Sequence, residues 1–182
     1  MLLKVDIEKA YDSIKWNTVL ATLTLMKFAE IGISLIKACI TSLTFSFLVN
    51  DQPSKWIFSQ RALSQGDPIS PFLFLLISHN LTVMLNFGLR NNMIPGIDIR
   101  LNNNFNHLMF ADDLIIITRA SRSVAKYCKL YLDIYRKLTS QSPNFCKSTI
   151  HLPTWRHRRI ISAIKNSLGM EIRFFPFNIW RF

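Results

Sequence analysis

Two adjacent carboxylates, Asp112 and Asp113, lie at the centre of an apolar stretch that runs from Leu108 to Ile117. The pattern predicts a strand on each side of an acidic tip. In a half-buried setting two neighbouring like charges repel and lose hydration, and a shared cation relieves both effects. The pair therefore indicates a site for a hard divalent metal. A plain Asp-Asp hairpin turn is the structural alternative, because aspartate tolerates turn geometry.

A third carboxylate, Asp6, ends an apolar strand that is predicted over residues 2–7. Three carboxylates can hold two Mg²⁺ ions, with Mn²⁺ as the alternative metal. One ion lowers the pKa of an attacking hydroxyl, and the other neutralises charge on the leaving phosphates. This donor set indicates phosphoryl or nucleotidyl transfer.

The segments around these acids must bring them together in the fold. Hydrophobic periodicity predicts helices over about residues 13–28, 33–43, 69–87, 121–138 and 155–168. The third is broadly apolar, so we expect it to be buried on most sides. Alternating residues predict a half-buried hairpin over 44–58, an edge strand over 97–101 and a weak strand over 148–152. This order predicts an α+β fold, in which helices back an antiparallel sheet and the acids meet at one edge.

The composition favours a folded protein that binds a polyanion. Hydrophobic residues make up 49% of the 182-residue chain and charged residues 18%, which excludes a disordered chain. The net charge of +11 comes entirely from residues 119–182, which hold thirteen Lys or Arg and two acidic residues. A solvated basic face is the alternative reading of this segment. An enzyme that acts on nucleic acid through metal ions needs both an acidic centre and a basic surface.

The sequence predicts neither a membrane protein nor a secreted one. Its longest apolar run, residues 71–77, is shorter than the ~18 residues that span a bilayer. Charged residues between positions 4 and 9 interrupt any apolar signal at the N-terminus. Cys39, Cys128 and Cys146 are odd in number and widely spaced, which favours a reducing compartment. We expect an intracellular protein without a membrane partner.

Three motifs in order resemble the palm motifs of reverse transcriptases from non-LTR (LINE-type) retrotransposons. They are DIEKAYD at residues 6–12, RALSQGDPISP at 61–71 and FADD at 110–113. QGDPISP together with FADD is the signature of that branch, and the resemblance extends to about residue 177. It implies a polymerase palm with two-metal nucleotidyl transfer onto a primer 3′-hydroxyl. The implied partners are an RNA template, a DNA primer and deoxyribonucleoside triphosphates.

The resemblance also implies roles for residues near the acids. Asp6 and Asp112 would be the principal metal ligands, and Asp113 would support them. The backbone carbonyl of Ile7 would reach one ion. Tyr11 would lie under the sugar of the incoming nucleotide and exclude a 2′-hydroxyl. An ordinary core aromatic is the structural alternative for Tyr11.

Three further residues receive roles from the same resemblance. Gln65 and Gly66 would lie beside the nascent base pair, where glycine permits close approach of the backbone. Lys147 would protonate the departing pyrophosphate. The alternatives are a turn and helix cap for Gln65 and Gly66, and a plain surface lysine for Lys147.

The sequence departs from the family pattern at both ends. Only five residues precede Asp6, where family members carry a fingers region, and the Tyr-Leu-Gly turn expected after residue 177 is replaced. We therefore expect a truncated palm, with the fingers largely missing and the thumb absent or truncated. Residues 1–152 would form the partial palm, and residues 153–182 a basic helix and a degenerate tail. Asp51 and Ala62 replace glycines common in the family, so we expect backbone strain at both.

These observations predict a fragment of an RNA-directed DNA polymerase with competent metal chemistry and impaired substrate binding. The alternative is a catalytically inactive nucleic-acid-binding remnant of a retroelement. A third hypothesis is a decayed product with no stable function. The sequence is compatible with both an active enzyme and an inactive relic.

Overall fold

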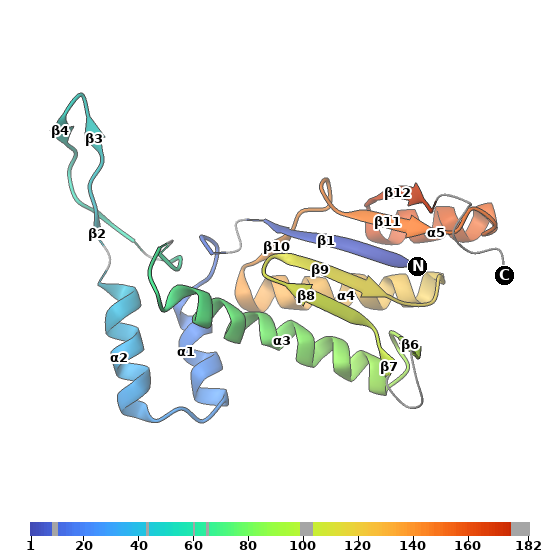
Figure 1. The fold of residues 1–182 in the computed structure, drawn as a ribbon, viewed down its shortest axis with the longest axis horizontal. Coiled ribbons are helices and arrows are strands. Elements are labelled where there is room, and N and C mark those ends of the chain that lie inside the picture. Colours follow the sequence, from blue (N-terminus) through green and yellow to red (C-terminus); the bar gives the residue numbers. More distant parts are fainter. Residues whose placement is uncertain (9–10, 43, 60, 65, 99–103, 176–182) are drawn as a thin grey trace. The chain divides into compact units, whose positions relative to one another are not determined.

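The computed structural model describes the chain except residues 9–10, 43, 60, 65, 99–103 and 176–182 (Figure 1). The chain forms two compact units. The first comprises Met1–Glu8, His79–Lys137 and Gln141–Phe182, and the second comprises Lys9–Ser78 and Leu138–Ser140.

The first unit is built on a six-stranded sheet in which β10 pairs with the end of β1 and the other strands follow the order β12–β11–β1–β9–β8. The strands are β1 (Leu2–Glu8), β8 (His107–Phe110), β9 (Asp113–Ile117), β10 (Ser142–Pro143), β11 (Thr149–Leu152) and β12 (Glu171–Phe174). Neighbouring strands are antiparallel, as expected, except for the parallel pair β11 and β12. The sheet therefore continues across the predicted boundary after residue 152, and that boundary stays a prediction.

β1 runs through the middle of this sheet, and buried and more exposed side chains alternate along it. Leu3, Val5 and Ile7 are buried, whereas Lys4 is exposed and Asp6 is half-buried. Successive residues of a strand point to opposite faces of its sheet. One face is therefore apolar and covered, and the other is polar and carries Asp6.

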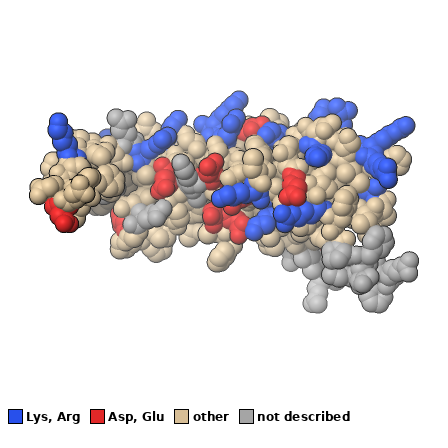
Figure 2. Space-filling view, turned by 90° about the horizontal axis from the view of Figure 1, so that it is seen from above, with Lys and Arg blue, Asp and Glu red and all other residues tan. Residues whose placement is uncertain are grey.

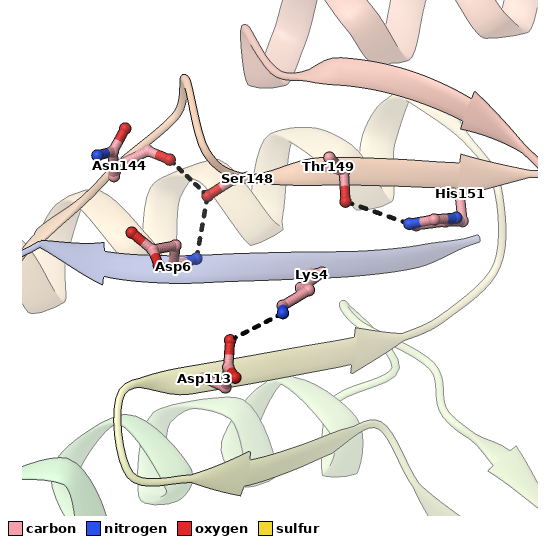
Figure 3. Close-up of polar contacts among 7 residues, drawn as sticks. All are labelled: Lys4, Asp6, Asp113, Asn144, Ser148, Thr149 and His151. Carbon is pink, nitrogen blue, oxygen red and sulfur yellow. Dashed lines mark hydrogen bonds and ion pairs between the residues drawn. The ribbon is translucent and has the colours of Figure 1, made fainter.

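Helices supply the apolar cover of the first unit. They are the C-terminal part of α3 (Ser70–Arg90), α4 (Arg122–Thr139) and α5 (Arg158–Leu168). Most of the apolar stripe of α4 is buried, including Cys128 and Tyr135, and Figure 3 shows α4 behind the strands. Ile164 and Leu168 are buried on α5, which ends at residue 168 as predicted and is capped by Gly169 in the left-handed conformation (φ 69°).

A buried asparagine, Asn106, joins three segments of the first unit. Its side-chain amide donates to the carbonyl oxygens of Leu85 and Ile94, both at 3.0 Å. Its backbone carbonyl accepts the N–H of Ile117 at 2.8 Å. Because a buried amide must keep its partners, Asn106 fixes the end of α3 and the following loop against β9. The short hairpin of β6 (Ile97–Asp98) and β7 (Asn104–Phe105) lies in between.

The second unit contains two helices, the first turns of α3 and a long hairpin. The helices are α1 (Trp16–Leu25) and α2 (Glu30–Thr41); in the hairpin β2 (Thr44–Phe45) pairs with β5 (Ile57–Phe58), and β3 (Leu48–Val49) pairs with β4 (Gln52–Pro53). The Trp16 indole N–H donates to the carbonyl of Ala62 at 2.8 Å, which anchors the segment before α3 to α1. Ala62 (φ 91°) and Asp51 (φ 59°) both have the positive φ that the sequence predicted.

Several features of the helices and the hairpin differ from expectation. α2 begins at Glu30, so Gly32 lies inside its first turn and does not break the pattern. The hairpin is exposed and not half-buried: Phe47 is 61% exposed and Leu48 74% exposed. Its paired segments are only two residues long, and such short ladders have little apolar face to cover.

α3 is less buried than predicted, because Phe72 and Phe87 are more than half exposed. His79 on the same helix is also exposed. By length and composition α3 could cross a membrane, with a mean hydropathy of 1.6 over a window that is 39% buried. One such helix is weak evidence for a membrane span, because the core helix of a folded domain has the same composition.

Candidate active site

Two of the three predicted carboxylates face each other across neighbouring strands. In the antiparallel register of β1 and β9, Asp6 lies directly opposite Asp113. Opposite residues in such a pair point to the same face, with Cβ atoms roughly 4.5–5.5 Å apart. The open face of the sheet thus carries both carboxylates at its edge near the end of β1.

The third carboxylate, Asp112, lies in the tight turn between β8 and β9. Ala111 and Asp112 form this turn, with Ala111 in the left-handed region (φ 50°). The N–H of Ile7 donates to the Asp112 carbonyl at 3.3 Å, which ties the turn to β1. Both Asp112 and Asp113 are exposed, so the expectation of a half-buried acidic tip is wrong. The apolar flanks are buried through alternate residues of β9, while the turn itself projects into solvent.

Lys4 compensates the charge of Asp113. Its ammonium lies 3.2 Å from Asp113 Oδ1, and both side chains are about half exposed (51% and 50%). Figure 3 shows the two side chains meeting between β1 and β9. An ion pair this exposed contributes only ~0–1 kcal/mol to stability. It nevertheless means that Asp113 already has a cationic partner.

The backbone of Asp6 is held on both sides by the segment that joins β10 to β11 (Figure 3). Its N–H donates to Ser148 Oγ at 3.1 Å, and its carbonyl accepts the N–H of Asn144 at 2.8 Å. Ser148 Oγ in turn donates to the Asn144 carbonyl at 2.7 Å, and Ser148 is fully buried. We call this arrangement of Asp6, Asn144 and Ser148 the Asp6 clasp. It fixes the point at which the first carboxylate leaves the sheet.

Lys147 belongs to the turn of the same segment. Its backbone N–H donates to the Asn144 carbonyl at 3.1 Å and to Asn144 Oδ1 at 3.2 Å. Its side chain is exposed. Lys147 directly precedes Ser148, whose hydroxyl accepts the Asp6 N–H, and its proposed role stays a prediction.

The remaining predicted residues belong to the second unit. Tyr11 is half-buried and stacks on Phe74 of α3, with ring centroids 4.7 Å apart and planes 16° from parallel. Its carbonyl accepts the N–H of Leu63 at 3.0 Å. Gly66 is exposed with φ 91°, a conformation that glycine adopts without strain. Gln65 lies outside the described residues.

The chemistry of the donors at the sheet edge fits a hard divalent cation. All three side chains offer carboxylate oxygens, and two of them share one face in register. Within the described ranges, no three His, Cys, Asp or Glu side chains stand close enough together to form a metal-binding cluster. The side chains of Asp6, Asp112 and Asp113 therefore need to turn toward one another before they can share ions.

Sequence reasoning missed the neighbours of the acids on the open face. Lys4 could have been found, because it lies two residues before Asp6 in a strand and this spacing places both on one face. Thr149 and His151 share that face through the register with β1, and Thr149 Oγ1 lies 3.1 Å from His151 Nε2. Partial burial and the nearby Arg173 lower the pKa of His151. Only the paired strands reveal Thr149 and His151 on this face, where they lie opposite Lys4 and Leu2.

Comparisons with known proteins agree with this geometry. Residues 1–159 match the protein family described as reverse transcriptase (RNA-dependent DNA polymerase). An uncharacterised mitochondrial protein of Arabidopsis thaliana is 40% identical over 70 residues, which make up 37% of this chain and 56% of that protein. A retrovirus-related Pol polyprotein from the type-1 retrotransposable element R2 of Popillia japonica is 26% identical over 116 residues, which make up 64% of this chain and 18% of the polyprotein.

Among solved structures, the chain is similar in fold to an apo telomerase from Candida tropicalis truncated from its C-terminal domain. The TM-score is 0.60 at 17% identity, over 81% of this chain and 29% of the telomerase chain. The chain thus spans about half of the mitochondrial relative and less than a third of the other two proteins.

Proposed function

This chain belongs to the reverse transcriptase family, and we propose that it carries the nucleotidyl-transfer centre of an RNA-directed DNA polymerase. The observation that carries the proposal is the register of β1 and β9, which sets Asp6 opposite Asp113 and leaves Asp112 in the adjoining turn. The similarity to the R2 polyprotein and the QGDPISP and FADD motifs support the non-LTR branch.

We propose Asp6, Asp112 and Asp113 as ligands of two Mg²⁺ ions, with the backbone carbonyl of Ile7 as a further oxygen ligand. Reverse transcriptases use divalent metal ions, and a set of oxygen donors suits Mg²⁺. When bound, the ions supply acidification of the attacking hydroxyl and neutralisation of charge on the leaving phosphates. The Asp6 clasp supports this role because it holds the Asp6 backbone through both its N–H and its carbonyl.

Lys4 limits the part that Asp113 plays. Its ammonium must move away from Asp113 before that carboxylate can bind a cation, since an ammonium 3.2 Å away occupies the same electrostatic position. We therefore assign the principal binding to Asp6 and Asp112, and a supporting role to Asp113.

The substrates that we propose are a DNA primer, an RNA template and deoxyribonucleoside triphosphates. Lys147 would protonate the departing pyrophosphate, and its exposed side chain beside the Asp6 clasp supports this role. Tyr11 would exclude the 2′-hydroxyl of ribonucleotides, while Gln65 and Gly66 would contact the nascent base pair. Cys39, Cys128 and Cys146 are free, which supports an intracellular location.

Primer extension on an RNA template tests the catalytic proposal. Asp112→Asn should reduce extension by at least about 100-fold, because it removes an anionic ligand while keeping the side-chain size. Asp98→Asn is the matched control, since Asp98 is also an exposed aspartate of the first unit but lies on β6. Equal extension rates in the two variants would refute the assignment of Asp112.

Metal binding gives a readout that is independent of turnover. Titration with Mn²⁺, followed by its electron paramagnetic resonance signal, should show that Asp6→Asn and Asp112→Asn weaken binding about tenfold or more, while Asp98→Asn does not. If all three variants bind Mn²⁺ as the parent chain does, the sheet edge is not the metal site.

Nucleotide selection separates the two roles of Tyr11. If Tyr11 faces the sugar, Tyr11→Val should raise ribonucleotide incorporation relative to deoxyribonucleotide incorporation. If Tyr11 only packs on Phe74, the substitution should lower thermal stability and leave that ratio unchanged.

A further inference from the structure

A basic groove with a volume of about 830 Å³ lies between α4 and α5 in the first unit. Five of its lining residues are cationic: Arg122, Lys126, Lys129, Arg158 and Arg159. The others are serine, alanine and asparagine residues of α5. Within the part of the chain that the structure describes, no acidic or aromatic side chain lines the groove. Its walls therefore consist mainly of hydrogen-bond donors and positively charged groups.

The two helices present these cations in an ordered way. Arg122, Lys126 and Lys129 are spaced four and three residues apart on α4, which places them on one face of that helix. Arg158 and Arg159 lie in the first turn of α5. Figure 2 shows mostly Lys and Arg side chains, with few acidic ones, to the right of the acidic side chains near the middle of the view.

Most of these cations form no ion pair with another described residue of the chain. Lys129 is satisfied, because it lies 3.8 Å from Asp133 Oδ1 and 3.5 Å from the centre of the Phe145 ring. Among the described residues, Arg122, Lys126, Arg158 and Arg159 form no ion pair. Their charges repel one another across the groove.

Helix electrostatics make the arrangement less favourable still. Arg122 begins α4 and Arg158 begins α5, and neither helix has an acidic residue in its first turn. The positive end of a helix dipole favours anions there and disfavours cations. The arginines at these helix starts therefore do not stabilise the fold. A bound anion would interact favourably with both the arginine side chains and the helix N-termini.

We propose that this groove binds the sugar-phosphate backbone of a nucleic-acid strand, at a site separate from the acidic edge of the sheet. Phosphate contacts come mainly from Arg, Lys, Ser and Asn side chains and from helix N-termini, and all of these are present here. Protein interfaces instead favour aromatic residues and are depleted in lysine. The acids lie on the open face of the sheet, whereas α4 lies behind the strands (Figure 3).

The composition of the groove sets the kind of binding. No aromatic ring lines it for base stacking, so recognition depends on phosphates and is independent of base sequence. Four phosphate contacts from the unpaired cations to a single strand give a slope of log K against log salt of about −2.8. Each contact contributes about fivefold in affinity at about 0.1 M salt relative to 1 M salt.

Fluorescence anisotropy with a labelled single-stranded RNA tests the proposal, using the full chain in EDTA so that metal ions make no contribution. Lys126→Gln combined with Arg158→Gln should weaken binding about 25-fold at about 0.1 M salt and reduce the slope by about 1.4. Lys137→Gln combined with Lys165→Gln is the matched control. It removes the same charge from the exposed surfaces of the same two helices, outside the groove.

Circular dichroism first verifies that each variant is folded. A large loss for the groove pair and a loss below about threefold for the control pair support the site. Equal losses overturn it, because binding then follows net charge and not the groove. DNA of the same base sequence should bind with the same slope. Polyglutamate or anionic vesicles that bind as tightly as RNA and depend equally on the groove pair would also overturn it.

The groove and the acidic edge should bind their ligands independently. Asp112→Asn should leave RNA affinity in EDTA unchanged, and the groove pair should leave Mn²⁺ binding unchanged. Failure of one experiment therefore leaves the other proposal standing.

Discussion

Ser148→Ala should destabilise the protein by removing the centre of the Asp6 clasp. The Asn144 carbonyl keeps its bonds from the N–H groups of Lys147 (3.1 Å) and Ser148 (2.9 Å), so it loses little. The Asp6 N–H, by contrast, loses its acceptor at 3.1 Å. A buried donor left without a partner costs about 1–3 kcal/mol. At about 2 kcal/mol, the melting temperature of a chain of this size should fall by about 4–8 °C.

Ser78→Ala is the matched control, because it makes the same change at another buried serine. Ser78 is 4% exposed on α3, and its hydroxyl has no hydrogen-bond partner among the described residues. Its removal should be neutral or stabilising, since alanine is also the better helix former. Urea unfolding followed by circular dichroism measures both variants, and hydrogen exchange should show faster exchange of the Asp6 amide in Ser148→Ala only. Equal losses of stability in the two variants would show that the clasp is not what holds Asp6.

Three further predictions concern other parts of the fold. Gly96→Ala should lower the urea midpoint, because its Cβ would clash with the backbone carbonyl of Phe105. Gly32→Ala, with nothing within 4 Å of the added Cβ, should raise stability by about 0.5–1 kcal/mol. Burial raises the pKa of Cys128 to about 12, so iodoacetamide at about pH 8 should modify the two exposed cysteines and reach Cys128 only in urea, as read by mass spectrometry. Burial lowers the pKa of His107 below 6.5, so the unfolded chain binds the proton more tightly and stability falls with the pH below that value. His107→Gln should weaken this dependence, and an unchanged difference between urea midpoints at about pH 7 and pH 5 would contradict the assignment.

Local patterns predicted much of the fold because they depend on neighbours in the sequence. The alternation in β1, the apolar stripe of α4 and the cap at Gly169 all follow from period and turn chemistry. The same patterns could not say whether another element covers an apolar face. Phe47 and Phe72 lie in apolar segments, but their side chains are exposed because no described element covers them.

The candidate site was chosen from residue types, and its role in metal binding stays a prediction. Asp112 and Asp113 were singled out as adjacent acids in an apolar stretch and Asp6 as the end of a predicted strand, and the register of β1 and β9 sets Asp6 opposite Asp113. The exposure of the turn was missed, because apolar flanks report the burial of the strands and not of the tip. Ser148 was missed because a buried serine between two short strands has no period or motif of its own.

The Asp6 clasp has a consequence for the synthesis of the protein. The Ser148 partner of Asp6 follows it by 142 residues in the sequence. At about 5–20 residues per second, about 7–28 s pass before the clasp can close. β1 also pairs with β9 and β11, which both come from later parts of the chain. During that interval the strand that carries the first carboxylate has unpaired edges, which makes the nascent chain a substrate for chaperones and prone to aggregate when translation stalls.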